Sequence, residues 1–431
     1  MLLKKYLSYV IPSILSMVAF YLYTLVDGIF VARFVGENAL AAVTVSSSFV
    51  TVVFAFGVLF AIGCSTVTSI YRGKNQLDNS NKVFTMSILI VSVLSIIISI
   101  FSFWKTELIL DILKANKDIY DMVYQYIHIL SCFVFFYIVS YNFEVLLKAD
   151  GYPNKSIIGV CLGAIFNIIL DPIFMGQLNM GIKGAALATG ISQFVTFSFF
   201  FYHFVFSGKS HYKFVKPPYP FEQLKKELSL GLADAIFELS PGIMIACFNI
   251  KIDQLLSTDG LVSFSVIMYV YNIVFMIMVG INQGTCPLLS YFHGQNNIQN
   301  YNKVRKYGRV TATIMSFLSL LMVLLLSKGI VSCYIDVDGA NYLYTVNALK
   351  KFSLAFIFMG NVVITSAFFS SEEKSFASLV ISLLRGIILP VAFLYLISMV
   401  LDAEYIWYSC LLSEFTSLVI CVVVNKESFA F

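Results

Sequence analysis

Polar residues that could bind a small cation interrupt the long apolar stretches in the first half of the chain. Asp27 lies deep in one stretch, and Asn167 and Asp171 are four residues apart in another, so they share a helix face. Thr189 lies in a run of small residues that lets helices pack closely. A charged side chain at mid-membrane costs about 2.5–3.5 kcal/mol and usually faces a bundle interior or a watery cavity. We therefore expect these four side chains to meet inside a helix bundle.

Two carboxylates, an amide and a hydroxyl can act in three ways. They can form an oxygen-rich pocket for a hard monovalent cation such as Na⁺, with Asp27, Asn167 and Asp171 as its ligands. They can form a carboxyl pair that takes up and releases a proton, because two buried like charges resist being ionised together. They can also form a hydrogen-bonded network that only holds helices together. The residues alone leave all three interpretations open.

A second acidic pair lies early in the second half of the chain. Asp234 and Glu238 are at i and i+4, shortly before Pro241. We expect Glu238 to face a central cleft and attract a cationic substrate; a pair near the membrane surface, bonded to lysine or water, is the alternative. Aromatic residues make up 16% of the chain, and a minority of them could line a cleft for a flat cation. Besides Glu238, the candidate cleft residues are Tyr141, Tyr271 and Gln283.

Two further charged pairs are interpreted as structural. Glu144 lies four residues before Lys148, an orientation that favours an ion pair near a helix end. Arg385 and Glu414 lie midway along the last two apolar stretches, where we expect them to neutralise each other.

The composition indicates a membrane protein. Of the 431 residues, 59% are hydrophobic and 12% are charged, and the mean hydropathy is +0.86; soluble domains are about 45–50% apolar and about 25% charged. This excludes a secreted domain, a cytosolic enzyme and a disordered chain. No basic block interleaved with aromatics indicates a nucleic-acid surface. Because apolar stretches of about 20 residues recur from end to end, we predict an all-α fold with twelve membrane helices: 6–33, 39–70, 83–104, 120–147, 156–175, 183–207, 228–257, 261–290, 304–327, 342–370, 375–398 and 404–425.

The positive charges predict the orientation of these helices. An even number of spans places both termini on one side of the membrane. The flanks on that side carry 18 Lys and Arg residues, against 6 on the other. Because cytoplasmic loops are enriched in positive charge, we expect both termini of this multi-pass protein to lie on the cytoplasmic side of the plasma membrane.

An internal repeat divides the chain into two halves. Residues 71–83 (YRGKNQLDNSNKV) match residues 292–304 (FHGQNNIQNYNKV) at a shift of 221. Six helices in each half make the repeats parallel, related by a pseudo-two-fold axis along the membrane normal. The sequence thus predicts two six-helix bundles, an N-lobe at 1–207 and a C-lobe at 228–431, joined by a proline-containing cytoplasmic linker at 208–227. Two such bundles can rock around a central cleft, as in secondary transporters.

Catalytic and nucleotide-binding motifs are missing from the sequence. HExxH, GxSxG and GxxxxGK[ST] do not occur. We therefore expect neither an enzyme nor a bound cofactor, and an ion gradient to drive any transport. The expected partners are a small organic substrate and the lipid bilayer, and the expected state is a monomer.

Three segments resemble the multidrug and toxic compound extrusion (MATE) family, of the multidrug/oligosaccharidyl-lipid/polysaccharide exporter superfamily. They are residues 26–33 (VDGIFVAR) with 36–43 (GENALAAV), 147–155 (LKADGYPNK), and 167–174 (NIILDPIF) with 181–189 (GIKGAALAT). The resemblance implies an antiporter that exports organic, often cationic, compounds in exchange for H⁺ or Na⁺. Its coupling site would match Asp27, Asn167, Asp171 and Thr189, and an acid of some members would match Glu238. A further acid of such members has no match, because residues 352–371 contain no Asp or Glu.

The same superfamily suggests an alternative function, a flippase for a lipid-linked oligosaccharide or a related metabolite exporter. The cleft of such a flippase should carry several Arg or Lys residues to bind a pyrophosphate. The only deep basic candidate in the sequence is Arg385, which disfavours this alternative.

Overall fold

A computed structural model of the chain describes residues 1–216, 222–339 and 341–424. The described residues form helices and no strand, which confirms the predicted all-α class. The helices of the first half are α1 (Leu2–Phe34), α2 (Glu37–Gly73), α3 (Leu77–Trp104), α4 (Thr106–Leu113), α5 (Tyr120–Ser131), α6 (Val134–Ala149), α7 (Pro153–Asp171), the π-helical turn η1 (Pro172–Gln177) and α8 (Ile182–Val205). Those of the second half are α9 (Glu222–Gly294), α10 (Ile298–Ser332), α11 (Tyr342–Ser353), α12 (Phe356–Ser371), α13 (Ser375–Leu383), η2 (Leu384–Ile388), α14 (Leu389–Val400), η3 (Ala403–Tyr408) and α15 (Ser409–Val424).

The number of membrane-spanning helices is consistent with the predicted twelve. Within the described ranges, nine helical segments are long and apolar enough to cross a membrane. Two more spans are bent pairs: α5 with α6 at 56°, and α11 with α12 at 40°. One of the nine, Gln223–Gly294, contains a non-helical residue, Ser257, at which two helices meet in a kink. The short helix α4 is an addition that the sequence did not predict.

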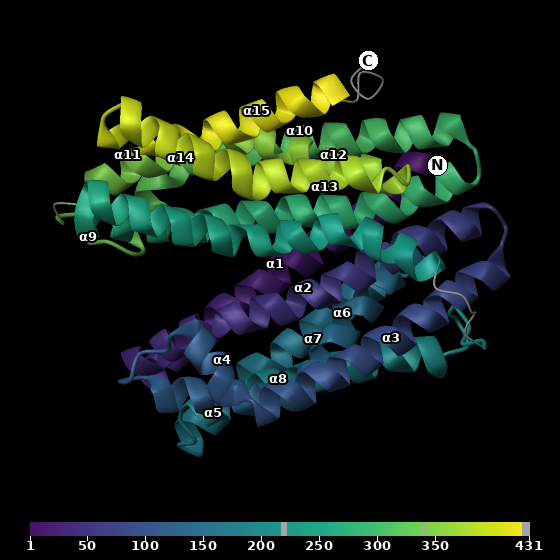
Figure 1. Ribbon diagram of the computed structural model, residues 1–431, viewed down its shortest axis with the longest axis horizontal. Coiled ribbons are helices and arrows are strands. Elements are labelled where there is room, and N and C mark those ends of the chain that lie inside the picture. Colours follow the sequence, from purple (N-terminus) through teal and green to yellow (C-terminus); the bar gives the residue numbers. More distant parts are fainter. Residues whose placement is uncertain (217–221, 340, 425–431) are drawn as a thin grey trace.

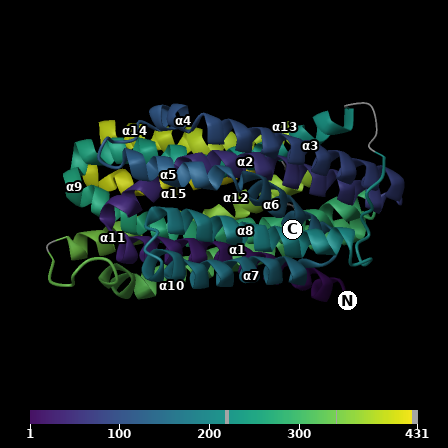
Figure 2. The ribbon, with the colours of Figure 1, turned by 90° about the horizontal axis from the view of Figure 1, so that it is seen from below.

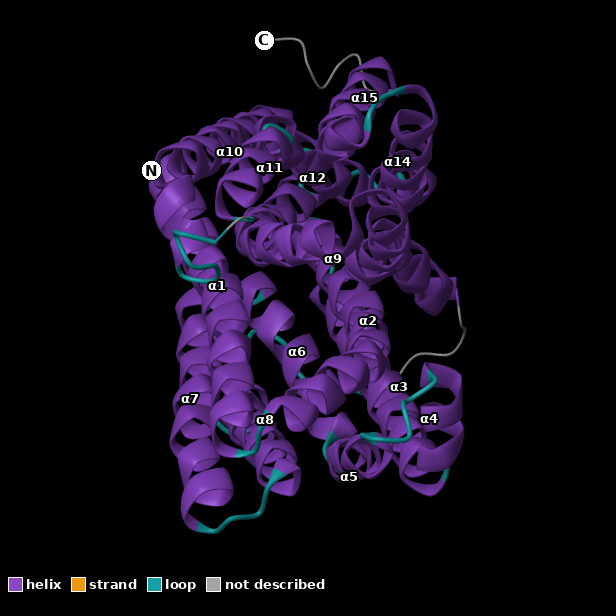
Figure 3. Ribbon diagram, turned by 90° about the vertical axis from the view of Figure 1, so that its left-hand side faces the viewer, coloured by secondary structure: helices purple, strands orange, loops and turns teal. Residues whose placement is uncertain are grey.

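The helices form two groups that run roughly parallel to the long axis of the molecule (Figures 1 and 2). Helices α1–α8 make up the N-lobe and α9–α15 the C-lobe; Figure 3 shows one group stacked on the other, seen from one end. We call the end that carries residue 1 and the turn between α2 and α3 the proximal end, and the end that carries α4 the distal end. In Figure 1 the lobes converge toward the proximal end, on the right, and diverge toward the distal end.

Glycines allow the lobes to touch at the proximal end. A Cβ on Gly63 of α2 would overlap the backbone of Glu227, and a Cβ on Gly231 would overlap the carbonyl oxygen of Leu59. A Cβ on Gly284 would likewise collide with α1. Gly63 and Gly284 are 221 residues apart, so equivalent positions of the two repeats each contact the first helix of the other lobe. Backbone contact therefore closes the proximal half of the interface.

The structure describes part of the segment that was predicted as the linker, residues 208–227. Residues 208–216 lie along the N-lobe, where the backbone N–H groups of Lys213 and Val215 donate to Asn81 and Thr85. Residues 217–221, with the prolines that motivated the prediction, lie outside the described residues. Helix α9 begins at Glu222, so the last part of the predicted linker is helical.

Candidate functional site

The two N-lobe aspartates face each other across α1 and α7. Asp27 is 7% exposed and Asp171 is fully buried, and their carboxyl groups lie close enough to interact directly. Asp171 ends α7 because Pro172 follows it, lacks an N–H and opens the π-helical turn η1. Asn167 lies one turn earlier on the same face and is also fully buried. Helix α7 thus ends with an amide and a carboxylate on one face, and the carboxylate lies beside that of α1.

Several polar atoms of this cluster have no hydrogen-bond partner among the described residues. They are Oδ1 of Asp27, both side-chain polar atoms of Asn167, both carboxylate oxygens of Asp171 and Oγ1 of Thr189. Buried polar groups are almost always hydrogen-bonded, and each exception needs an explanation. A neighbouring pair of carboxylates is the strongest such exception, because like charges repel unless a proton or another cation lies between them. The donor set therefore fits a small cation.

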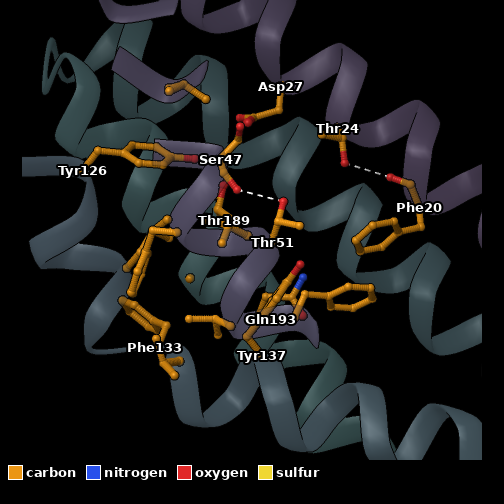
Figure 4. A pocket seen from close by; sticks show the side chains of 18 of the residues that line it. Phe20, Thr24, Asp27, Ser47, Thr51, Tyr126, Phe133, Tyr137, Thr189 and Gln193 are labelled. Carbon is orange, nitrogen blue, oxygen red and sulfur yellow. Dashed lines mark hydrogen bonds between the residues drawn. The ribbon is translucent and has the colours of Figure 1, made fainter. Parts of the chain in front are cut away.

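Thr189 and Tyr126 border the same site from α8 and α5. Figure 4 shows Asp27, Thr189 and Tyr126 directed toward a common space. The phenol of Tyr126, 5% exposed, lies near both the Thr189 hydroxyl and the Asp27 carboxyl. The structure thus brings Asp27, Asp171 and Thr189 together and keeps Asn167 beside them. Sequence reasoning missed Tyr126. It relied on the free-energy cost of placing a charged side chain in the membrane, and a neutral aromatic residue has no such cost.

A cavity of about 260 Å³ opens beside Asp27 in the distal half of the N-lobe (Figure 4). Two carboxylates line it, Asp27 from α1 and Glu238 from α9, and no Lys or Arg is among its described lining residues. Glu238 is therefore the contribution of the C-lobe. The aromatic lining residues are Phe20, Tyr23, Phe49, Phe54, Tyr126, Phe133 and Tyr137.

Gln193 and Tyr23 continue the polar lining of this cavity. The Nε2 of Gln193 donates to the Tyr23 hydroxyl at 3.3 Å, and Ser140 donates to Gln193 Oε1 at 3.3 Å. The sequence did not indicate a role for either residue. Each only shares a helix with a predicted site residue, Tyr23 with Asp27 and Gln193 with Thr189.

The other three candidate cleft residues lie outside the described lining of this cavity. Gln283 Nε2 donates to the Tyr141 hydroxyl at 2.8 Å, which joins the C-lobe to the N-lobe in the closed proximal half. Tyr271 lines a separate, small cavity of the C-lobe, with Arg385 and Glu414. Of the four, the structure places Glu238 alone beside the Asp27 site.

The predicted ion pair between Glu144 and Lys148 is present and more buried than expected. Lys148 Nζ lies 2.8 Å from Glu144 Oε1, and Lys148 is fully buried. The ammonium also donates to Gln283 Oε1 at 2.6 Å, and Ser156 donates to Glu144 Oε1 at 3.1 Å. The pair is therefore part of a polar contact between the lobes, a role that the i,i+4 spacing alone could not show.

The predicted neutralisation of Arg385 by Glu414 is confirmed. Arg385 Nη2 lies 2.8 Å from Glu414 Oε1, and both residues are at most 5% exposed. The guanidinium also lies over the rings of Phe237 and Phe275, at 4.6 and 5.6 Å from their centroids. Glu414 thus has a fixed cation, whereas the described contacts of Asp27 and Asp171 include no Lys or Arg.

Comparison with known proteins agrees with this architecture. A family model described as MatE matches residues 12–173 and 243–396. The chain is 22% identical over 395 residues to the multidrug export protein MepA of Staphylococcus haemolyticus, covering 90% of this chain and 86% of that protein. It is 23% identical over 316 residues to MepA of Staphylococcus aureus, covering 73% and 68%.

Solved structures have the same fold. An outward-facing conformation of a multidrug resistance MATE family transporter superposes with a TM-score of 0.93 at 20% identity, covering 98% of this chain and 95% of that one. A crystal structure of MATE in complex with MaL6 gives the same TM-score, identity and coverage. The family model matches well over half of the residues of this chain. The chain therefore belongs to the MatE family of multidrug and toxic compound extrusion transporters.

Proposed function

We propose that this chain is an antiporter that exports small organic cations across the plasma membrane in exchange for a proton or a sodium ion. The observation that carries the proposal is the buried Asp27–Asp171 pair, with unpartnered oxygens beside an aromatic cavity. The relatives named as multidrug export proteins support export as the direction.

Exchange is assigned to Asp27 and Asp171 because the described contacts of these two buried acids include no Lys or Arg, unlike those of Glu414. Glu414 is held by Arg385, so it has no need of an exchangeable cation. Asp27 and Asp171 interact with each other, and their proximity favours binding of a cation from solution. Carboxylate, amide and hydroxyl oxygens are suitable ligands for Na⁺, and the carboxyl pair alone suffices for a proton.

Asp27 links the ion to the substrate. It belongs both to the carboxyl pair and to the lining of the cavity, so an ion on the pair and an organic cation in the cavity compete for the same negative charge. Binding of the ion then weakens binding of the substrate while the lobes are apart at the distal end. Such competition is the simplest route to exchange, since a ligand shifts an equilibrium only by its differential affinity.

The lining favours flat, lipophilic cations as substrates. Aromatic faces attract cations, and Asp27 and Glu238 supply negative charge on opposite lobes. A lipid-linked pyrophosphate would need basic residues in the cleft. The described lining contains none, and the one deep arginine that the sequence offered, Arg385, is bound to Glu414 in another cavity. The lining therefore favours the cation exporter over the flippase.

Transport by purified protein in liposomes tests the proposal. A fluorescent lipophilic cation is loaded, and a sodium gradient or a pH gradient is imposed separately. We expect one of the two gradients to drive movement of the cation and the other to have no effect at equal membrane potential. No movement under either gradient would contradict ion-coupled export, and transport of a lipid-linked sugar instead would favour the flippase.

A further inference from the structure

Glu227 is another buried carboxylate at the contact between the lobes, far along the chain from the pair of Asp27 and Asp171. Glu227 belongs to the first turns of α9, and its side chain is inserted into the N-lobe beside α2 and α3. It is fully buried. The Ser87 hydroxyl of α3 donates to its Oε1 at 2.5 Å, whereas its Oε2 has no hydrogen-bond partner among the described residues.

The internal repeat supplies a counterpart for this residue. Tyr6 of α1 is 221 residues before Glu227, is equally buried, and is inserted into the C-lobe near Thr285. Thr285 is in turn the repeat equivalent of Cys64, which lies beside Glu227. The first helix of each lobe thus inserts one polar side chain into the other lobe. One of the two is a phenol and the other a carboxyl group.

The surroundings of Glu227 favour the protonated carboxyl. The groups that face it are Cys64 on α2 and Ser87 on α3, and no cationic side chain among the described residues pairs with it. The neighbouring Lys226 is directed elsewhere, to Glu373 at 2.6 Å. Burying an ionised carboxylate without a cation is strongly unfavourable, and protonation removes that cost.

Opening of the proximal end must expose this carboxyl. The backbone at Glu227 touches Gly63, so the lobes cannot separate there without withdrawing α9 from the N-lobe. Water then reaches the side chain and can solvate an ionised carboxylate. The closed and open states of the proximal end therefore differ by one bound proton at this residue.

We propose that Glu227 is a proton-exchange site of the transport cycle, distinct from the aspartate pair. It takes up one proton from the proximal solution when the proximal end closes, and it returns that proton to the same solution when this end opens. No proton crosses the membrane by this route; the carboxyl makes closure depend on the pH of the proximal side. The inference rests on the proposed alternating opening of the two ends, and it is independent of the ion that drives export.

Native cysteines report the opening. Cys286 of α9 is buried, with its sulfur 3.6 Å from the Thr66 hydroxyl across the lobe interface. Cys333 is exposed at the distal end of α10 and serves as the reference for the intrinsic reactivity of a thiol, and Cys410 is buried within the C-lobe. The purified full chain, without substrate or gradient, is treated with a water-soluble maleimide between pH 6 and 8. Labelling of each cysteine is then quantified by peptide mass spectrometry.

We expect the labelling of Cys286, divided by that of Cys333, to rise with pH by up to about tenfold per unit, the limit for one proton. Glu227→Gln keeps an acceptor for Ser87 but cannot ionise, so its ratio should be low and independent of pH. Tyr6→Phe, the matched control at the equivalent position, should keep the rise of the wild type. Cys410 should stay unlabelled in every variant.

Three outcomes would overturn the proposal. They are a wild-type ratio that does not change with pH, a Glu227→Gln variant that responds like the wild type, and a Tyr6→Phe variant that loses the response. A response that survives in Asp27→Asn supports a separate site, and its loss there would assign the proton to the aspartate pair instead. Failure of export in liposomes with an intact labelling response would contradict the proposed function and leave this inference standing.

Discussion

Gly73 and Gly294 lie against each other where the two lobes meet, and they are equivalent residues of the 221-residue repeat. A Cβ on Gly73 would lie 3.0 Å from Gly294, and one on Gly294 would overlap the carbonyl oxygen of Ile70. Gly73 ends α2 and Gly294 ends α9. The ends of two equivalent helices thus meet at the pseudo-two-fold axis, and a side chain on either glycine would hold them apart.

Gly73→Ala should therefore weaken closure of the proximal end. The added Cβ meets backbone atoms, which cannot rotate away as a flexible side chain can. We expect increased maleimide labelling of Cys286 and slower export of a fluorescent cation, with each lobe still folded. The matched control is Gly329→Ala in α10, where a Cβ meets nothing within 4 Å and alanine favours the helix. Unchanged labelling and export in Gly73→Ala would show that this contact does not limit closure.

The aspartate pair could be predicted from the sequence because charge inside an apolar stretch has a cost that the sequence makes visible. The same argument found Glu238 and the pair of Arg385 with Glu414. It assigned no role to Glu227. This residue follows Lys225 and Lys226, so the sequence pattern predicts that it belongs to the polar linker. Its burial follows from the insertion of one lobe into the other, and spacing along the chain does not contain that information.

The remaining differences have the same origin. Tyr141 and Gln283 are polar residues on apolar helices, as a cleft residue would be. They instead form a hydrogen bond with each other, although they lie 142 residues apart in the chain. Whether a helix face meets the cleft or the other lobe depends on which end of the molecule is closed. The bend between α5 and α6 also gave no signal, because Cys132 and Phe133 at the break are ordinary helix residues without proline or glycine.

Asp27→Asn and Asp171→Asn should each abolish ion-coupled export. Either change removes one negative charge from the pair, so the remaining carboxylate no longer needs a cation to offset repulsion. We expect export in liposomes to fall to the level of empty liposomes, with unchanged helical circular dichroism. Asp253→Asn, at an exposed position of α9, is the control for loss of a carboxylate. Full export by both aspartate variants would rule out the proposed coupling site.

Lys148→Met should destabilise the protein strongly. The substitution removes the donor that the Glu144 carboxylate and the Gln283 side-chain oxygen share, and both acceptors are buried. Breaking a buried ion pair from one side costs about 3–5 kcal/mol. The double variant Glu144→Gln with Lys148→Met should recover most of that loss, because no unpaired charge remains. Thermal unfolding in detergent measures both effects.

An exposed pair with the same spacing provides the control for Lys148. Lys82 Nζ lies 2.5 Å from Asp78 on the surface of α3, and exposed pairs contribute little to stability. Lys82→Met should leave the melting temperature nearly unchanged. If Lys148→Met also had no effect, or if the double variant were as unstable as the single one, the contact between the lobes would not stabilise this conformation.

Glu372, at the proximal end of α12, should make stability depend on pH. Burial alone would raise the pKa of its carboxyl, but hydrogen bonds from Lys374 and Tyr301 and the charge of Arg305 lower that pKa below its ordinary value of 4.5. A carboxyl with a lowered pKa stabilises the fold above its ordinary value, and that stability is lost as the pH falls through the lowered value. Glu372→Gln should therefore lower the melting temperature at pH 7, and the difference from the wild type should shrink below pH about 4.

The contacts of Glu372 explain why this pH dependence would report on the packing of two helices. Its Oε1 accepts from the Tyr301 hydroxyl at 2.8 Å, and its Oε2 lies 2.8 Å from Lys374 Nζ, so one carboxylate joins α12 to α10. Tyr301→Phe removes one of these donors and should reproduce part of the loss at pH 7. Glu107→Gln, at an exposed position of α4, should melt like the wild type throughout. A constant difference between Glu372→Gln and the wild type from pH 7 to pH 3 would mean that the charge of Glu372 does not stabilise this contact.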